Sequence, residues 1–329
     1  MNNITFLVSN RCNLRCRHCF ANSGSKLNEE LTNFEKYKAI DKLKKIGTKK
    51  VVFSGGEPLL NKEILNLIRY TKNIGLKVGI LTNGTLLSDK MINELQKYID
   101  SLSISVYTND ILGFNKETYE KYLMKLTSTL INLTNSNIKF KITLPISQNN
   151  VKDIYNILEL CIDKKIKPKT FRIYVITPVG RAKENKDICT EQVDFLEIVK
   201  KFPEKIKKSD LNIGIEQSSI DILSNCSQKC YKKCQIVEYE KIFLSQYADP
   251  HMDANGDLYL CGLLLRNEKY KIGNILKDTE QDIEAKTKNI AEKIKNMDQE
   301  DCCPMLNRKT EKGKQLVCPI IYIDQKEMQ

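Results

Sequence analysis

Cys12-Asn-Leu-Arg-Cys16-Arg-His-Cys19 is the most informative stretch of this sequence. The residues before it, Ile4-Thr-Phe-Leu-Val-Ser9, indicate a short buried strand. The three thiols therefore lie on a loop just past a strand, at spacings of four and three residues. Thiolates are the usual ligands of iron–sulfur clusters. Four thiolates fill a cubane cluster, one per iron, whereas three leave one iron open to bind and activate a small molecule.

The sequence also allows three simpler roles for these cysteines. They could be structural side chains that lie close together by chance. They could bind zinc, although structural zinc takes four ligands and usually shows paired C-x2-C units. They could form disulfides, but these need an oxidising compartment, and the sequence shows no signal peptide. An iron–sulfur cluster accounts for the spacing and the loop position together.

The C-x3-C-x2-C pattern on the first strand-to-helix loop resembles that of the radical S-adenosylmethionine enzymes. The resemblance implies that Cys12, Cys16 and Cys19 hold a 4Fe–4S cluster, whose open iron is chelated by the amine and carboxylate of S-adenosylmethionine. It also implies reductive cleavage to a 5′-deoxyadenosyl radical, which abstracts a hydrogen atom. Such radical chemistry belongs to the cofactor, while the protein supplies position and excludes water. Many family members carry an aromatic residue before the third cysteine, where this chain has His18.

The composition fits a globular protein of 329 residues, 41% of them apolar. No stretch approaches the about 20 apolar residues of a membrane span. Twelve cysteines without an export signal indicate metal sites in a reducing cytoplasm. The net charge of +12 comes from 53 Lys and Arg against 41 Asp and Glu. The lysines are scattered among glutamates without a compact block, which favours solvated helix faces, and leaves an acidic peptide or a nucleic acid as an open alternative.

Short apolar runs alternate with longer amphipathic segments from residue 3 to about residue 176, which predicts strands and helices in alternation. The expected strands are Ile4–Val8, Lys50–Phe53, Lys77–Leu81, Ser101–Val106, Lys139–Leu144 and Phe171–Ile176. The first expected helix follows a capping box, Thr32-Asn-Phe-Glu35, and stops near Gly47. The other expected helices are Lys62–Ile74, Ser88–Ile99, Lys116–Leu133 and Val151–Lys164.

Six such units in series predict an α/β fold with a parallel sheet and right-handed crossovers. The pattern alone does not distinguish a closed barrel from an open one. The family resemblance implies a partial (βα)6 TIM-like barrel, open on one side for a large substrate. Active sites in such barrels lie at the carboxyl ends of the strands.

The motifs expected to bind S-adenosylmethionine follow those strands. The second strand ends in Gly55-Gly56-Glu57-Pro58, which resembles the family element whose backbone and glutamate receive the methionine amino group. The ordinary alternative is a strand-to-helix turn. The resemblance further assigns Asn83, after the third strand, and Ser105, on the fourth, where Tyr107 replaces the usual aspartate. Arg181, after the sixth strand, offers a planar fork for the cofactor carboxylate or is a surface arginine.

The chain divides by composition into three parts. Residues 1–182 form the expected barrel, residues 183–225 a polar helical bridge with Val193, Leu196, Ile198 and Val199 as its buried face, and residues 226–329 a cysteine-rich part. Cys161, on a helix, and Cys189, on the bridge, are expected to be small buried side chains.

The last part resembles the SPASM and twitch extensions of the family, which hold two or one auxiliary iron–sulfur clusters. Asp253-Ala-Asn-Gly256 predicts a hairpin turn before Cys261, and Ile272-Gly-Asn-Ile275 follows. Full SPASM domains have a denser run of cysteines near the end than this chain. Adjacent cysteines diverge along an extended backbone, so one cluster is expected and a second is less certain. The candidate auxiliary ligands are Cys226, Cys230, Cys234, Cys261, Cys302, Cys303 and Cys318.

Cys261 is expected to ligate together with Cys318, one of Cys302 and Cys303, and one of Cys226, Cys230 and Cys234. Zinc is the alternative metal, because four thiolates at irregular spacing also suit it. A further alternative is that the spare member of the Cys302-Cys303 pair is a free thiol that donates a hydrogen atom to a substrate radical.

The sequence thus predicts a cytoplasmic radical S-adenosylmethionine enzyme of the SPASM/twitch type that modifies a ribosomally made peptide, with a thioether, a crosslink, an epimer or an oxidised side chain as product. The expected partners are a precursor peptide and an electron donor such as flavodoxin or ferredoxin. The chain begins at the first barrel strand, so a separate protein or the basic surface is expected to hold any leader. The alternatives are a maturase acting on a whole protein, as sulfatase-maturing relatives do, and an iron–sulfur RNA-binding or redox-sensing protein. No catalytic residue could be assigned.

Overall fold

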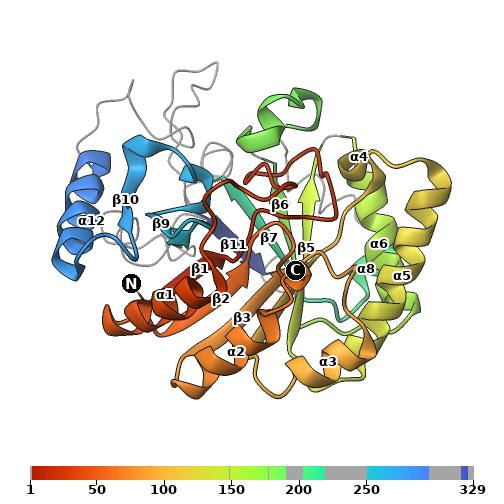
Figure 1. Ribbon diagram of the computed structural model, residues 1–329. Helices are drawn as coiled ribbons and strands as arrows, with labels where there is room; N and C mark the ends of the chain where they lie inside the picture. The colour runs from red at the N-terminus through yellow and green to blue at the C-terminus, as the bar shows by residue number, and fades with distance from the viewer. Residues whose placement is uncertain are drawn as a thin grey trace.

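The computed structural model describes residues 2–147, 149–176, 178–189, 203–218, 250–295 and 320–324. Six parallel strands pair in chain order, so each strand lies beside the next one in the sequence (Figure 1). They are β1 (Asn3–Leu7), β2 (Lys50–Ser54), β3 (Lys77–Thr82), β4 (Ser101–Ser105), β5 (Phe140–Ile146) and β6 (Thr170–Val175). Each predicted strand is confirmed to within two residues. In the described part of the chain, β1 and β6 do not pair with each other, and the barrel is therefore partial.

The helices between the strands pack along one side of the sheet (Figure 1). They are α1 (Asn33–Lys45), α2 (Ile64–Asn73), α3 (Asp89–Leu95), α5 (Lys116–Thr134) and α6 (Val151–Asp163), with the shorter α4 (Asn109–Leu112) after β4. The predicted capping box at the start of α1 is present, because Thr32 and Glu35 each accept a hydrogen bond from the other's backbone N–H. None of the described helices is long and apolar enough to cross a membrane.

The two faces of the parallel sheet differ in polarity. On β4, Leu102 and Ile104 are buried in the core beneath the helices, while the intervening Ser101, Ser103 and Ser105 are half-exposed on the opposite face. A fully covered parallel sheet is apolar on both faces. The polar inner face of β4 is therefore consistent with a barrel that opens toward solvent or a substrate.

Further strands extend both edges of the six-stranded sheet. At one edge, β8 (His251–Met252) pairs in parallel with β1, followed by the antiparallel β9 (Asp257–Tyr259) and β10 (Lys271–Asn274), and then α12 (Glu280–Lys295). The predicted hairpin before Cys261 is confirmed, with Gly256 at φ +87° in its turn. At the other edge, β7 (Ile213–Ser218) pairs in parallel with β6, and β11 (Ile320–Asp324) pairs with β7.

The segment 183–225 therefore differs from the expected helical bridge. It contains the short turns η3 (Lys186–Ile188) and α8 (Glu204–Lys207), but its residues 213–218 form a sheet strand. The alternation in Ile213-Gly-Ile-Glu-Gln-Ser218 is too brief to separate a strand from a polar helix in the sequence. The apolar residues expected to form the bridge's buried face lie outside the described residues.

Strands β8 to β10 form the C-terminal hairpin region, called the C-terminal hairpin below. Arg266, between β9 and β10, joins it to the loop after β1. Its Nε donates to Asp253 Oδ2 at 2.7 Å, and its Nη atoms donate to the carbonyl of Ala21 at 2.8 Å and to Asn10 Oδ1 at 2.9 Å. The Asp253 side chain is 1% exposed, so Arg266 is the cation that compensates a buried carboxylate. One side chain thus holds segments about 250 residues apart in the sequence.

We expect Arg266→Ala to lower the free energy of unfolding by about 3 kcal/mol, because it leaves the Asp253 carboxylate buried without its partner. Urea unfolding followed by circular dichroism measures this loss. The double variant Arg266→Ala/Asp253→Ala should recover part of it, since no charge then stays buried. An unchanged midpoint in Arg266→Ala would mean that the hairpin is not held to the barrel by this contact.

Candidate active site

The cysteine loop between β1 and α1 is closed at its base by backbone hydrogen bonds. Cys12 N–H donates to the Gly24 carbonyl at 3.0 Å, and Gly24 N–H donates to the Asn10 carbonyl at 2.8 Å. Two backbone N–H groups point at sulfur: Leu14 donates to Cys12 Sγ at 3.4 Å and Ser23 donates to Cys19 Sγ at 3.3 Å. Hydrogen bonds to ligating sulfurs are one of the means by which a protein tunes a cluster's potential.

The three thiols of this loop lie close enough to influence one another. Burial raises the pKa of Cys16 and of Cys12, and the neighbouring thiols raise both further. Within the described ranges, no three Cys, His, Asp or Glu side chains are arranged around a single metal ion. A cubane cluster takes one thiolate per iron, so its three ligands need not converge on one point.

The Gly55–Gly56 turn after β2 packs directly on the backbone where the cysteine loop begins. Gly55 has φ +140°, and a Cβ there would lie 2.4 Å from the Ser9 carbonyl oxygen. A Cβ on Gly56 would lie 2.2 Å from the Arg11 carbonyl oxygen. Gly56 and Glu57 also donate their N–H groups to the carbonyls of Ser9 and Arg11, both at 2.8 Å. The two glycines therefore allow the turn after β2 to lie directly against the backbone of the cysteine loop.

Glu57 is buried, with 1% of its surface exposed, and both its carboxylate oxygens accept hydrogen bonds. Oε1 accepts from Thr82 Oγ1 at 2.7 Å and from Leu59 N–H at 3.1 Å, and Oε2 accepts from Asn83 N–H at 2.8 Å. Burial raises the pKa of Glu57, while these three donors lower it. Pro58 then begins the short turn η1 (Pro58–Leu60), for which Glu57 is the N-cap.

Asn83 links the end of β3 to the cysteine loop. Its Nδ2 donates to Asn13 Oδ1 at 3.0 Å, and its Oδ1 accepts from Thr85 Oγ1 at 2.6 Å. Asn13 Nδ2 in turn donates to Thr85 Oγ1 at 2.8 Å, which closes a ring of three side chains. Asn83 and Glu57 are thus joined to each other and to the residue that follows Cys12.

His18 lies between two tyrosines from the carboxyl ends of β4 and β6. Its ring centroid is 5.2 Å from that of Tyr107, and its Nε2 is 3.4 Å from the Tyr174 hydroxyl. Burial, followed by the charge of Arg181, lowers the pKa of His18 to about 4. Its Nδ1 is buried, and no described residue forms a hydrogen bond with it. Ser105, on the same strand end as Tyr107, accepts from Thr143 Oγ1 at 3.2 Å.

Arg181 contacts the cysteine loop through both its side chain and its backbone. Its Nη1 donates to the Cys16 carbonyl at 2.7 Å, its Nη2 to the Ser23 carbonyl, and its N–H to the Cys19 carbonyl at 3.0 Å. Neighbouring Gly180 has φ +59°, and a Cβ there would lie 2.2 Å from the Phe20 carbonyl oxygen. Arg181 therefore lies at the cysteine loop, where its guanidinium donates hydrogen bonds to backbone carbonyls.

Cys261 lies at the end of the C-terminal hairpin, beside the same loop. His251, on β8, contacts both sides: its ring is 6.1 Å from the ring of Phe20, which follows Cys19, and a Cβ on Gly262 would lie 2.6 Å from its Nε2. Cys261 is half-buried. The remaining candidate auxiliary ligands lie outside the described residues: Cys226, Cys230, Cys234, Cys302, Cys303 and Cys318.

Of the two remaining cysteines of the described chain, Cys161 is a small buried side chain as expected, and Cys189 is only partly buried. Cys161 is 1% exposed on α6, and burial raises its pKa to about 12. Cys189 is half-buried, and its Sγ donates to the Ala182 carbonyl at 3.5 Å.

Several residues at the site were not found from the sequence. Asn13 and Arg17 lie between the motif cysteines, so their position in the motif was the available signal. Glu30 closes the loop from its far end, where its carboxylate accepts from Ser9 Oγ and from Asn10 N–H, each at 2.9 Å. No sequence signal marked it, because a loop glutamate is ordinarily a solvated charge.

The residues present fit a 4Fe–4S cluster and S-adenosylmethionine. Three thiols share one loop, two of them receive backbone N–H groups, and the loop is held on two sides by the chain. The buried, unpartnered Nδ1 of His18 is a polar atom that a bound ligand can satisfy. The site lies at the carboxyl ends of the strands, as expected for a barrel of this class.

Comparisons with known proteins show what the chain is similar to. A family model described as "Radical SAM superfamily" matches residues 6–186. The Fe-coproporphyrin III synthase of Methanosarcina barkeri is 30% identical over 213 residues, which are 61% of this chain and 52% of that protein. The chain thus spans about half the length of this curated relative.

Solved structures share the fold. SuiB of Streptococcus suis, bound to the precursor peptide SuiA, has a TM-score of 0.62 at 17% identity over 85% of this chain and 63% of SuiB. The protein anSMEcpe, with bound AdoMet and the Cp18Cys peptide, has a TM-score of 0.59 at 15% identity over 95% of this chain and 92% of its own.

We expect Gly56→Ala to destabilise the protein by about 1–3 kcal/mol, because the new Cβ meets the rigid backbone of Arg11. Gly24→Ala is the matched control on the same loop. The three atoms nearest to its Cβ belong to the end of the flexible Arg15 side chain, which can move aside at the expense of its hydrogen bond to the Ser23 carbonyl. Thermal unfolding of the two variants checks the difference, and equal melting temperatures would contradict the close packing described for the turn.

Proposed function

Because this chain belongs to the radical SAM superfamily, we propose that it is an enzyme that modifies a ribosomally made peptide. Membership of the family implies a 4Fe–4S cluster and S-adenosylmethionine as cofactors. Bound together and reduced, these cofactors supply a 5′-deoxyadenosyl radical that abstracts a hydrogen atom from the substrate. The crosslink, thioether, epimer or oxidised side chain expected from the sequence are the candidate products.

Cys12, Cys16 and Cys19 are the proposed cluster ligands, because they share a loop after β1 that residues following β2, β3 and β6 hold in place. The Gly55–Pro58 turn and Asn83 are proposed to line the methionine side of the cofactor. Ser105 is proposed to contact the ribose or the carboxylate. Arg181 is proposed to support the cofactor site indirectly, by holding the cysteine loop through the carbonyls of Cys16 and Ser23.

The observation that carries the peptide assignment is the extent of the shared fold. Both peptide-bound structures align over more than four fifths of this chain, which reaches beyond the barrel itself. The polar inner face of β4 supports the same assignment, because a peptide backbone needs hydrogen-bonding partners. A flavodoxin- or ferredoxin-like donor would supply the electron.

Cys261 is proposed to ligate an auxiliary cluster in a SPASM- or twitch-like C-terminal part. The hairpin that carries it is docked on β1 and fastened to the cysteine loop by Arg266. This arrangement would place an auxiliary cluster on the side of the barrel where Phe20 and His251 meet. Such a cluster could bind the substrate or accept an electron.

A tetrapyrrole is the second candidate substrate. It is favoured by the relative named Fe-coproporphyrin III synthase, whose match covers 61% of this chain at 30% identity. A tetrapyrrole and a peptide make different demands on the open side of the barrel, since the former presents a flat macrocycle and the latter an extended backbone. The two are separated most simply by direct assay.

The proposed ligands are tested by replacing Cys12, Cys16 and Cys19 singly with alanine. We expect each variant, reconstituted with iron and sulfide and reduced with dithionite, to lose 5′-deoxyadenosine formation, because an iron of the cluster loses its thiolate. Iron that remains in the triple variant reports the auxiliary site: about four atoms per chain indicate one cluster and about eight indicate two. Wild-type turnover in any single variant would refute the assignment, and zinc in place of the remaining iron would refute the auxiliary cluster.

The substrate class is tested by incubating the reduced enzyme with S-adenosylmethionine and either a precursor peptide or a tetrapyrrole precursor of Fe-coproporphyrin III, the compound that the name of the relative gives as its product. The peptide candidates are short open reading frames encoded beside this gene. With the reaction run in D2O, we expect a mass change on a peptide, which an epimer also shows by taking up deuterium, together with 5′-deoxyadenosine, while the macrocycle is recovered unchanged. A mass change on the macrocycle alone would contradict the peptide assignment in favour of the second candidate.

A further inference from the structure

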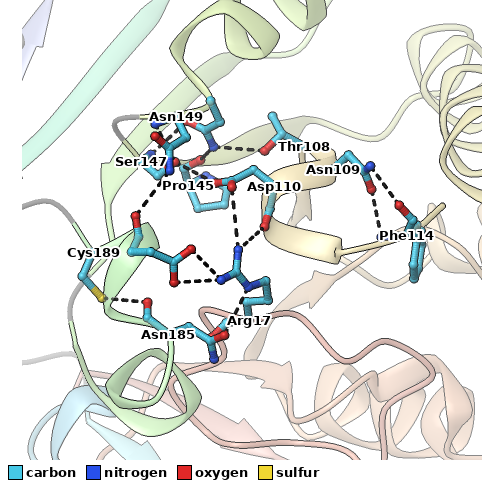
Figure 2. A network of polar contacts seen from close by, with 12 residues as sticks. Arg17, Thr108, Asn109, Asp110, Phe114, Pro145, Ser147, Asn149, Asn185 and Cys189 are labelled. Atoms are coloured by element: carbon cyan, nitrogen blue, oxygen red, sulfur yellow. Dashed lines mark hydrogen bonds and ion pairs between the residues drawn. The ribbon is translucent and has the colours of Figure 1, made fainter. Parts of the chain in front are cut away.

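Arg17, between the second and third motif cysteines, lies among the loops that follow other strands of the barrel (Figure 2). Its Nε donates to Asn185 Oδ1 at 3.1 Å, and its Nη1 donates to the Asp110 carbonyl at 3.1 Å. Its Nη2 donates to both oxygens of the Asp187 carboxylate, at 2.8 and 2.6 Å. Its backbone N–H donates to the Ile111 carbonyl at 3.0 Å. One residue of the cysteine loop thus binds the segments after β4 and after β6.

The partners of Arg17 are themselves held in place. Asp110 Oδ2 accepts from Ser147 Oγ at 2.8 Å, and Asn149 Nδ2 donates to the Asp187 carbonyl at 3.4 Å, so the loop after β5 supports both acids (Figure 2). Asn185 Nδ2 donates to the Arg181 carbonyl at 2.9 Å and to the Arg17 carbonyl at 3.4 Å. The acceptors that surround the guanidinium are therefore ordered by contacts of their own.

The contact between the cysteine loop and the segment 180–189 runs in both directions. Arg17 reaches from the loop to Asn185 and Asp187, and Arg181 reaches back to the carbonyls of Cys16 and Ser23. Each guanidinium is planar and rigid, so each fixes direction as well as distance. Two crossing arginines restrict the turn from Cys16 to Cys19 more than either one alone.

This turn needs external support, because it belongs to neither a helix nor a strand. Among backbone hydrogen bonds, the one that joins its two ends is Cys19 N–H to the Cys16 carbonyl at 3.2 Å. The positions of two thiols therefore depend on what holds the turn from outside. Groups that orient the ligands of a metal site commonly matter to its function nearly as much as the ligands themselves.

We propose that Arg17 is a positioning residue for the cluster: it fixes the turn that carries Cys16 and Cys19 against the segment after β6. The inference rests on the proposed cluster ligands. The ion pair between Arg17 and Asp187 adds little to overall stability, because the Asp187 side chain is 58% exposed and exposed ion pairs contribute little. Its effect lies in the geometry and order of the turn.

The test compares Arg17→Ala with Arg69→Ala. Arg69 forms an arginine–carboxylate contact with Glu94 at 2.9 Å, with side chains 40% and 28% exposed, but it joins α2 to α3 away from the cysteines. Hydrogen exchange of the metal-free chain should show lost protection of residues 12–24 in Arg17→Ala and wild-type protection there in Arg69→Ala. Arg17→Lys, which keeps the charge without the fork, should restore protection in part.

The reconstituted enzyme gives a second readout. In Arg17→Ala the iron content should stay near that of the wild type, since every thiol is present. The electron paramagnetic resonance signal of the reduced cluster should change in g values, and formation of 5′-deoxyadenosine should fall about 10-fold. Arg69→Ala should keep the wild-type signal and rate.

The proposal would be overturned if the Arg17→Ala variant matched the Arg69→Ala variant in hydrogen exchange of residues 12–24, in the resonance signal and in the rate of 5′-deoxyadenosine formation. If Arg17→Ala does not fold, the double variant Asn185→Ala/Asp187→Ala serves instead, because it removes both side-chain acceptors of Arg17 in the segment after β6. Lost protection of residues 12–24 in that variant supports the proposal, and unchanged protection overturns it. The exchange measurement needs no cluster, so its outcome is independent of whether the cysteine substitutions bear out the proposed ligands.

Discussion

The packing of the Gly55–Gly56 turn against the backbone of residues 9–11 is the contact on which the rest of the site depends. A side chain at Gly56 would collide with the Arg11 carbonyl, and the N–H groups of Gly56 and Glu57 bond to that same stretch. The contact sets where the cysteine loop leaves β1. It also turns the Glu57 carboxylate toward β3, where it accepts from Thr82 and Asn83. This one close backbone contact thus fixes the relative positions of the loops after β1, β2 and β3.

From that base the cysteine loop is held by chain segments that are remote in the sequence. Asn13 is held by Asn83 and Thr85, and Arg17 and Arg181 cross between the loop and the segment after β6. The C-terminal hairpin adds Arg266 from the other side. The loop has no regular structure of its own, so these contacts replace the internal hydrogen bonds of a helix or strand. The conformation of the cysteine loop is therefore set by its contacts with the barrel.

Much of this could be predicted from local pattern. The six parallel strands and their helices followed from alternating apolar runs, and the capping box at Thr32 and the hairpin before Cys261 followed from short-range turn chemistry. The polar contacts between distant segments could not. Arg181 was a candidate for the cofactor carboxylate with a surface arginine as the alternative, and the hydrogen bonds from its fork to backbone carbonyls depend on backbone geometry that no sequence spacing reveals. Strand β7 was missed because its six residues carry too little periodicity to oppose the surrounding polar pattern.

The most direct test of the central claim is electron paramagnetic resonance of the dithionite-reduced enzyme with and without S-adenosylmethionine. An iron with no protein ligand at the cysteine loop should bind the cofactor. We therefore predict a reduced-cluster signal whose g values shift when S-adenosylmethionine is added, and the shift should be absent from the Cys12/Cys16/Cys19 triple-alanine variant. A signal that S-adenosylmethionine leaves unchanged, or a shift that persists in the triple variant, would contradict the assignment of the cluster to this loop.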